Sequence, residues 1–432
     1  MDVFEILVLV LSFVILLSIG VPISYSIGIA TLLTMLLSIN TMPSLTTVSQ
    51  RMATGLDSFA LLAIPFFILA GQLMNSGGIA RRLIDFAKVL VGKLPGGLAF
   101  VNILAAMLFG AISGSAVAAA SAIGGFMTPI MEDEGYDKSF SAAVNITSAT
   151  TGLIIPPSNI LIVYSLASGG VSIAALFLAG YIPGIIFGLS LMLVAFVYAK
   201  KHNYKVNAVF SLGDAVKKFL DALPSLLLII IVIGGIVAGY FTATEASAVA
   251  VLYAFILSVV FYKEIKIKDL PNILLSSAST TAIVMLLVGT SMAMSWVMAY
   301  ENIPQNVAEA LLALSDNGII ILIVINLILL FIGTFMDMTP AVLIFTPIFL
   351  PVVVHLGIDP IHFGIMMVMN LSVGLCTPPV GSVLFVGCSV ANLPITKVIK
   401  PLIPMFIAMI VALLLVTYIP ELTMFVPQLF GY

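Results

Sequence analysis

The chain has 432 residues, of which 62% are hydrophobic and only 8% are charged, and its formal net charge is −3. Soluble domains are about half apolar and about a quarter charged. These values exclude a water-soluble globule, an intrinsically disordered chain and a nucleic-acid-binding protein. A membrane β-barrel would need segments of about ten residues with alternating polarity, whereas this chain has long apolar runs. The composition therefore predicts an all-α polytopic membrane protein.

Ten apolar segments are long enough to cross a bilayer once, since a spanning helix needs about 20 mostly apolar residues. They cover roughly residues 3–19, 22–40, 58–77, 139–169, 173–199, 219–240, 244–262, 271–300, 362–391 and 400–419. The first segment lacks the basic flank and the small-residue cleavage site of a signal peptide. We therefore expect it to be retained as a spanning helix.

Two further apolar regions, 97–131 and 318–353, are each too long for one span and are interrupted at the centre. The interruptions are Ser113-Gly114-Ser115 in the first region and Thr334, Asp337 and Thr339 in the second. We interpret both regions as re-entrant helical hairpins. Asp337 is the one carboxylate expected deep in the apolar region, where an ionisable group is a functional-site candidate. Capping of the following helix is an equally open role for it.

The distribution of basic residues predicts the orientation, because lysine and arginine collect on the cytoplasmic side of a membrane. With ten single crossings and two hairpins that do not cross, fifteen of the sixteen basic residues fall on one side. Only Arg51 falls on the other side, and counting either hairpin as a crossing destroys this separation. The sequence therefore predicts that the N-terminus and the C-terminus both lie outside.

A polar stretch at 200–218 divides the chain into two halves, 1–199 and 219–432, which match at an offset of 222 residues. Seven residues of the first half have an identical residue 222 positions later. The pairs are Pro129 and Pro351, Gly135 and Gly357, Asp137 and Asp359, Gly152 and Gly374, Leu153 and Leu375, Pro156 and Pro378, and Pro157 and Pro379. Each half has five spans and one hairpin. Because five is odd, the second half inserts upside down, which is the inverted repeat of secondary transporters. Chance similarity between Gly/Pro-rich membrane segments is the alternative.

Proline pairs interrupt one span in each half, at Pro156-Pro157 and at Pro378-Pro379. In lipid every backbone polar group needs a partner, and proline removes a donor, so these helices should unwind around a cavity. A half-helix N-terminus holds an anion without a basic residue. We therefore expect a substrate carboxylate against Pro156, Pro157, Ser158, Asn159, Pro378 and Pro379. Ordinary proline kinks are the alternative.

The same segments offer oxygen ligands for Na⁺, which are what a hard cation prefers. We expect two Na⁺ sites, each between a hairpin tip and the unwound turn of the same half. The first would use Ser113, Gly114, Ser115, Thr150, Thr151 and Gly152, and the second Thr334, Asp337, Thr339, Gly374 and Thr377. We predict no other metal and no cofactor.

No enzyme motif is present, since the chain lacks a His-Glu-x-x-His zinc motif, a Walker Gly-x-x-x-x-Gly-Lys and a nucleophile with a matching histidine. The absence of a phosphate-binding loop also excludes direct ATP coupling by this chain. A secondary transporter is the favoured interpretation. An ion channel and an intramembrane hydrolase are the two other classes considered.

At these residues the sequence resembles the large membrane subunit of tripartite ATP-independent periplasmic (TRAP) transporters, a group within the ion-transporter superfamily. The resemblance covers essentially the whole chain. It rests on segments 110–125, 152–159, 242–246, 335–340, 357–364 and 376–381.

The resemblance implies a Na⁺-driven importer of an organic acid in a bacterial inner membrane, with a small membrane subunit and a periplasmic substrate-binding protein as partners. A stand-alone Na⁺/organic anion symporter is an alternative. Sialic acid, C4-dicarboxylates and sugar acids all remain candidate substrates.

The resemblance also implies an elevator mechanism, in which the hairpins and broken helices move against a scaffold made of the other spans and the arms. In the first half the expected scaffold is 1–77, the arm 78–95, the hairpin 97–131 and the broken helix 139–169. In the second half the expected scaffold is 219–300, the arm 302–316, the hairpin 318–353 and the broken helix 362–391.

Overall fold

The computed structural model describes residues 3–204, 212–315, 317–378 and 380–432. All regular structure in these ranges is helical, which confirms the all-α prediction. The α-helices are α1 (Val3–Ser18), α2 (Ile23–Ser38), α3 (Thr41–Leu56), α4 (Ala63–Ser76), α5 (Ile79–Val91), α6 (Gly97–Ser113), α7 (Ala116–Asp133), α8 (Lys138–Ala149), α9 (Asn159–Ala167), α10 (Ile173–Lys201), α11 (Leu212–Val237), α12 (Ala243–Phe255), α13 (Leu270–Tyr300), α14 (Ile303–Leu314), α15 (Gly318–Gly333), α16 (Met338–His355), α17 (Pro360–Gly374), α18 (Ser382–Val390), α19 (Ile395–Tyr418) and α20 (Glu421–Leu429). Short 3₁₀ turns occur at η1 (Phe59–Leu62), η2 (Thr151–Leu153) and η4 (Ile267–Asp269), and η3 (Ile256–Phe261) is a π-helical extension of α12.

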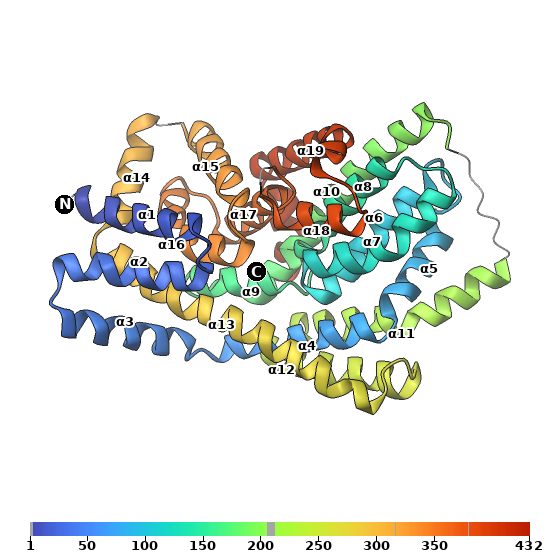
Figure 1. Cartoon of the computed structure of the whole chain (residues 1–432), viewed down its shortest axis with the longest axis horizontal. Coiled ribbons are helices and arrows are strands. Elements are labelled where there is room, and N and C mark those ends of the chain that lie inside the picture. The colour runs from blue at the N-terminus through green and yellow to red at the C-terminus, as the bar shows by residue number, and fades with distance from the viewer. Residues whose placement is uncertain (1–2, 205–211, 316, 379) are drawn as a thin grey trace.

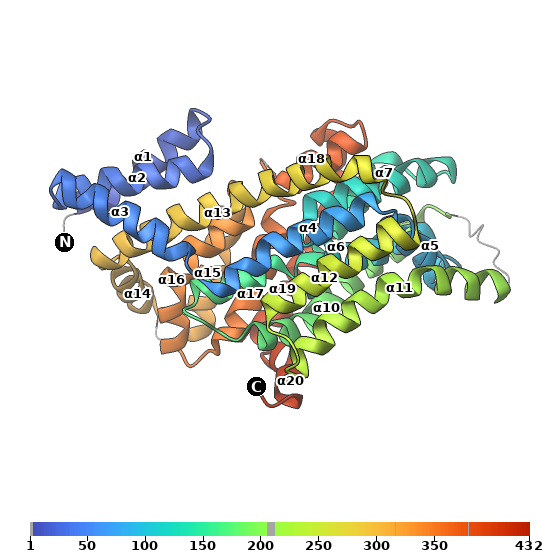
Figure 2. The same cartoon turned by 90° about the horizontal axis from the view of Figure 1, so that it is seen from below.

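The helices form two layers (Figures 1 and 2). In the first layer, here called the scaffold (α1–α4 and α11–α13), α4 packs against α12 and α13, and α13 packs against α2 and α3. The second layer, here called the hairpin group, consists of α6–α10 and α15–α19. The long helices α10 and α19, expected outside the moving part, pack against α6, α8 and α17 of this group. The arms α5 and α14 connect the two layers, since α5 contacts α6 and α11 while α14 contacts α13 and α16.

Seven helices in the described residues are long and apolar enough to cross a membrane. Six of them coincide with expected spans, and the seventh, Met338–His355, is the second helix of the second hairpin region. The six are Phe59–Ser76, Ile173–Lys201, Gly213–Val237, Ala243–Phe261, Ile267–Tyr300 and Ile395–Tyr418. The remaining expected spans are shorter apolar helices or are divided in two. Helices α3 and α20 were not expected, because the threonine, serine and glutamine content of α3 and the short length of α20 hide them from a search for spans.

Both expected hairpin regions contain two helices that meet at a short turn. Helix α6 ends at Gly114, which adopts a left-handed conformation with φ of +63°, and Ser115 caps α7 by accepting a hydrogen bond from the Ala118 N–H at 3.2 Å. In the second region, Thr334–Asp337 separates α15 from α16. The proline pairs lie between α8 and α9 and between α17 and α18, where the backbone leaves the helical path.

Equivalent contacts hold each hairpin to the broken helix of its own half. Gly110 and Gly152 bring α6 and η2 into backbone contact, and Gly333 and Gly374 do the same for α15 and α17. The amide of Asn102 donates to the Ser148 hydroxyl at 2.9 Å. In the second half, the Asn370 amide donates to the Asn326 side-chain oxygen at 2.7 Å. Interhelical hydrogen bonds of this kind contribute about 0.6 kcal/mol each on average in membranes.

We predict that Gly152→Ala lowers the thermal unfolding temperature, because the added Cβ would overlap the Gly110 Cα. Overpacking of this kind costs about 1–3 kcal/mol. The matched control is Gly125→Ala on α7, where a Cβ meets no atom within 4 Å. Thermal unfolding of the purified protein in detergent measures both. Equal unfolding temperatures for the two variants would contradict the contact.

A carboxyl pair joins α1 and α2 to the end of α13. The Ser38 hydroxyl lies 2.7 Å from Glu5 Oε1 and 3.0 Å from Glu301 Oε1. One hydroxyl proton cannot donate to two carboxylates, so one carboxyl group must carry a proton for both bonds to form. Burial, followed by the hydrogen bond with Glu5, raises the pKa of Glu301. Of the two carboxyl groups, Glu301 is therefore the one that favours the protonated form.

This raised pKa makes the stability of the N-terminal helices pH-dependent. A group with a raised folded-state pKa contributes stability at low pH, and the contribution is lost as pH rises through that pKa. We expect the wild-type unfolding temperature to fall relative to that of Glu301→Gln, which stays neutral throughout, as the pH rises above the ordinary range of a glutamate carboxyl. Glu309→Gln, at an exposed position on α14, is the control. Parallel pH profiles for wild type and Glu301→Gln would refute the shared proton.

Candidate functional site

A cavity of about 430 Å³ lies where the two hairpin turns and the two broken helices meet the scaffold. The hairpin group supplies residues 113–118, 337–339, 153, 159–160, 163, 375 and 382–383. The scaffold closes the other side with residues of α4 and α13. The cavity is therefore a composite of both halves of the chain.

Four helices begin at the wall of this cavity. Their first residues, Ala116 of α7, Asn159 of α9, Met338 of α16 and Ser382 of α18, all line it. Each helix N-terminus carries about half a positive elementary charge and free backbone N–H groups. Side chains cap only α7, while α9, α16 and α18 have no side-chain cap. The Leu384 N–H of α18 already donates to the Leu375 carbonyl at 3.3 Å. Helix N-termini without a side-chain cap are suited to bind an anion through their remaining N–H groups.

The side chains around the cavity are mostly neutral. Among the described lining residues, Asp337 is the only one with an ionisable side chain, and none is lysine, arginine or histidine. Asp337 occupies the N-cap position of α16, and its side chain makes no capping hydrogen bond there. The Ser382 hydroxyl oxygen is buried and has no hydrogen-bond partner among the residues that the structure describes. An uncompensated buried hydroxyl at a helix N-terminus is suited to bind a ligand oxygen.

The residues predicted to bind substrate are not all placed in the same way. Asn159 lines the cavity and lies against the hairpin turn, since a Cβ on Gly114 would be 2.7 Å from its amide nitrogen. Ser158 is buried, and its hydroxyl donates to the Leu153 carbonyl at 2.5 Å instead. Pro157 faces a small hollow against α4, α11 and α12. Pro156 and Pro378 do not line the cavity, and Pro379 lies outside the described residues.

In the first predicted ion site, the hairpin turn and the unwound turn take different positions. Ser113, Gly114 and Ser115 line the cavity. Thr150 and Thr151 are buried behind it, and their hydroxyls donate to the carbonyls of Thr147 and Ser148 at 3.0 and 2.6 Å. Hydroxyl oxygens that donate internally keep lone pairs for a cation. The donor types therefore fit Na⁺.

In the second predicted ion site, a backbone hydrogen bond links the hairpin turn to the broken helix, from Gly381 N–H to the Thr334 carbonyl at 3.1 Å. Asp337 and Thr339 line the cavity. The hydroxyls of Thr334 and Thr377 donate to the carbonyls of Phe331 and Val373 at 2.7 and 2.8 Å. Gly374 is packed against Gly333 on the far side of this turn.

Four polar lining residues were missed by sequence reasoning, namely Gln72 and Asn75 of α4, Thr280 of α13 and Ser382 of α18. Gln72 and Asn75 are three residues apart, so they share one face of a helix. That spacing in an otherwise apolar span is a signal that could have been used. Thr280 belongs to a Ser/Thr-rich stretch, and nothing in the sequence distinguishes the one residue of that stretch that lines the cavity.

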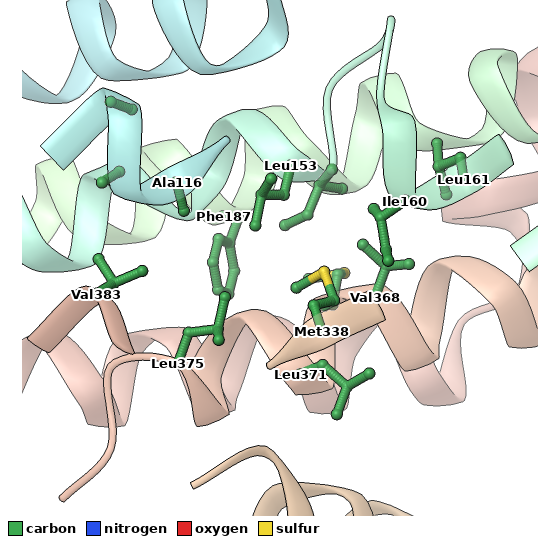
Figure 3. Packing of buried hydrophobic residues seen from close by; sticks show 14 of the residues in the cluster. Ala116, Leu153, Ile160, Leu161, Phe187, Met338, Val368, Leu371, Leu375 and Val383 are labelled. Atoms are coloured by element: carbon green, nitrogen blue, oxygen red, sulfur yellow. The ribbon is translucent and has the colours of Figure 1, made fainter. Parts of the chain in front are cut away.

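Apolar packing between the two halves supports the cavity (Figure 3). Ala116, Leu153 and Ile160 of the first half face Met338, Leu375 and Val383 of the second half. All six side chains are buried or almost so. This core keeps the four helix N-termini in register with one another.

The fold is that of a polytopic helical membrane protein. Two solved transporter structures share the fold. MtrF of Neisseria gonorrhoeae, from a class of antimetabolite efflux pumps, has a TM-score of 0.62 and 13% identity over 86% of this chain and 84% of its own. YdaH of Alcanivorax borkumensis has a TM-score of 0.61 and 14% identity over 88% of both chains.

The sequence profile of the tripartite ATP-independent periplasmic transporter, DctM component, matches residues 10–422, and the chain therefore belongs to this family. It is the large permease of a TRAP transporter and not an enzyme. This confirms the resemblance drawn from the sequence motifs.

Relatives in this family match over nearly their whole length. The Salmonella typhimurium protein YgiK is 57% identical over 99% of this chain and 98% of its own. The C4-dicarboxylate TRAP transporter large permease DctM of Rhodobacter capsulatus is 40% identical over 95% and 96%. The sialic acid TRAP transporter large permease SiaM of Vibrio cholerae is 39% identical over 96% of both.

Proposed function

We propose that this permease imports an organic acid together with Na⁺ across a bacterial inner membrane. The observation that carries the proposal is the convergence of four helix N-termini on one cavity whose described lining has no basic side chain. Such a cavity attracts an anion through backbone N–H groups. Permeases at about 40% identity carry names with organic acids, including C4-dicarboxylate and sialic acid.

Na⁺ coupling is supported by the donor sets at the two hairpin turns. Each turn presents hydroxyl and carbonyl oxygens, and the second adds the Asp337 carboxylate. Two Na⁺ ions bound beside the cavity would add positive charge next to the substrate carboxylate, so ion and acid would bind more tightly together. In this proposal Na⁺ is a co-transported ion held by oxygen ligands at the two hairpin turns.

An elevator mechanism is supported by the two-layer arrangement. In this proposal the hairpin group, including α10 and α19, moves as one body against the scaffold. The repeated glycine contacts and asparagine hydrogen bonds of the two halves are those expected of an inverted repeat. At the boundary between the two layers, Gly71 of α4 packs closely against the first hairpin turn, since a Cβ on Gly71 would lie 2.9 Å from the Ser113 carbonyl oxygen.

Membership of the family supports two protein partners, a small membrane subunit and a periplasmic substrate-binding protein that delivers the acid.

The arm α5 is attached to the scaffold by charged side chains. Arg82 of α5 stacks over the Tyr262 ring at 3.6 Å and pairs with Glu264 at 3.4 Å. Lys218 of α11 lies 3.6 Å from Asp85 of the same arm. These contacts fix the arm to the scaffold on the side proposed to be cytoplasmic.

Uptake into proteoliposomes tests the function directly, with the permease and small subunit in the membrane and the binding protein and Na⁺ outside. Hydrogen bonds to a charged group contribute about 1.5–3 kcal/mol, so Asn159→Ala should cut uptake about tenfold or more. Asn40→Ala, which removes an exposed amide far from the cavity, is the control. Na⁺-independent uptake would exclude the coupling, and wild-type uptake by Asn159→Ala would place the acid elsewhere.

Labelling of single cysteines tests the orientation, in which both termini are periplasmic. Tyr240 is 80% exposed and Ile267 is 79% exposed, and they lie at opposite ends of α12. With Cys376 and Cys388 replaced, Tyr240→Cys should react with an impermeant maleimide in intact cells. Ile267→Cys should react only after permeabilisation. The reverse pattern would invert the topology.

A further inference from the structure

The cavity has two walls that differ in their polar groups. Given the proposed function, on which this inference rests, the difference indicates the class of substrate. The wall from the hairpin group holds all four helix N-termini and Asp337. The wall from the scaffold consists of Ile64, Ile68, Gly71, Gln72 and Asn75 on α4 and Thr280 and Val284 on α13. Neither α4 nor α13 begins at the cavity, so the scaffold wall has no helix N-terminus.

The polar groups of the scaffold wall are two amides and a hydroxyl. Gln72 and Asn75 lie in the last turns of α4 and face the cavity, and Thr280 faces it from α13. On the hairpin-group wall, several side-chain hydroxyls already take part in hydrogen bonds within the protein. On the scaffold wall, each of the two side-chain amides, Gln72 and Asn75, has two N–H donors and one oxygen acceptor. A ligand hydroxyl, which both donates and accepts, matches these groups.

A second carboxylate does not match this wall. An anion taken out of water needs a positive group or several donors, and in the described lining all the positive ends lie on the opposite side. A ligand with one charged end and a neutral, hydroxylated remainder satisfies both walls at once.

We propose that the substrate is a monocarboxylic acid with a polyhydroxylated chain. Its carboxylate binds at the N-termini of α9 and α18. Gln72, Asn75 and Thr280 are specificity-determining residues that hydrogen-bond its hydroxyl groups. A site built to bind a hydroxyl group rejects an analogue without it far more strongly than an apolar pocket rejects an added hydroxyl.

The test uses the permease with its small subunit in lipid nanodiscs in NaCl, and calorimetry measures the Kd of three probes. D-gluconate has one carboxylate and hydroxyl groups, hexanoate has the same number of carbons without hydroxyls, and succinate has two carboxylates. We expect D-gluconate to bind at least about tenfold more tightly than either of the others. Tighter binding of succinate or hexanoate would overturn the inference.

Variants locate the recognition. In Gln72→Leu/Asn75→Leu the ratio of D-gluconate to hexanoate affinity should fall by about tenfold or more. Phe66→Leu, on the same helix and outside the cavity lining, should keep the wild-type ratio. An unchanged ratio in the double variant would overturn the role of the scaffold wall. If none of the three acids bound in Na⁺, the proposed function would fail with it, whereas binding with the wrong preference defeats the substrate class alone.

Discussion

The structure depends on one constraint, that a backbone polar group in the hydrocarbon of a membrane must have a partner. Two hairpin turns and two proline breaks interrupt helices of the hairpin group, and each interruption frees N–H and C=O groups. The fold gathers all four interruptions around one cavity, where a ligand or ion can take the place of the lost helical partner. The same feature that would destabilise an ordinary span therefore lines the cavity.

Contacts across the midline make the site a property of both halves together. Helix α7 packs against α18, and α16 packs against α9, so each hairpin touches the broken helix of the other half. The Cys376 thiol lies 3.4 Å from the Ile146 carbonyl of α8 and 4.0 Å from the Thr150 hydroxyl, so the turn after α17 lies beside the end of α8. The Tyr164 hydroxyl donates to the Pro360 carbonyl at 2.6 Å and ties α9 to the start of α17. Each hairpin therefore contacts the broken helices of both halves.

Much of this arrangement could be predicted from the sequence, because glycine and proline mark the places where helices break. Asp137 and Asp359, matched by their spacing, each cap a helix by accepting a backbone N–H at 2.8 and 2.7 Å. Side-chain direction could not be predicted in the same way. Ser158 and Asn159 are neighbours, yet one turns back to its own loop and the other lines the cavity.

Other features required knowledge of which helices pack together. Gln72 and Asn75 matter only because α4 lies against the hairpin turns, and nothing local specifies that contact. The grouping of α10 and α19 with the hairpins likewise follows from packing, where Gly180, Gly184 and Gly188 of α10 allow close approach to Ile154, Ile155 and Met107. Hydropathy identifies a span, but it does not assign the span to a layer.

The central claim is that the hairpin group carries the cavity as one body past the scaffold. It is tested most directly by measuring the distance between spin labels at Asp133, at the base of the first hairpin, and Ile267, on an exposed turn of the scaffold. The account predicts two distinct distances whose populations shift when Na⁺ and substrate are added, while a pair within the scaffold, Tyr240 and Ile267, keeps one distance. A single unchanged distance between Asp133 and Ile267 in a protein that still transports would contradict it.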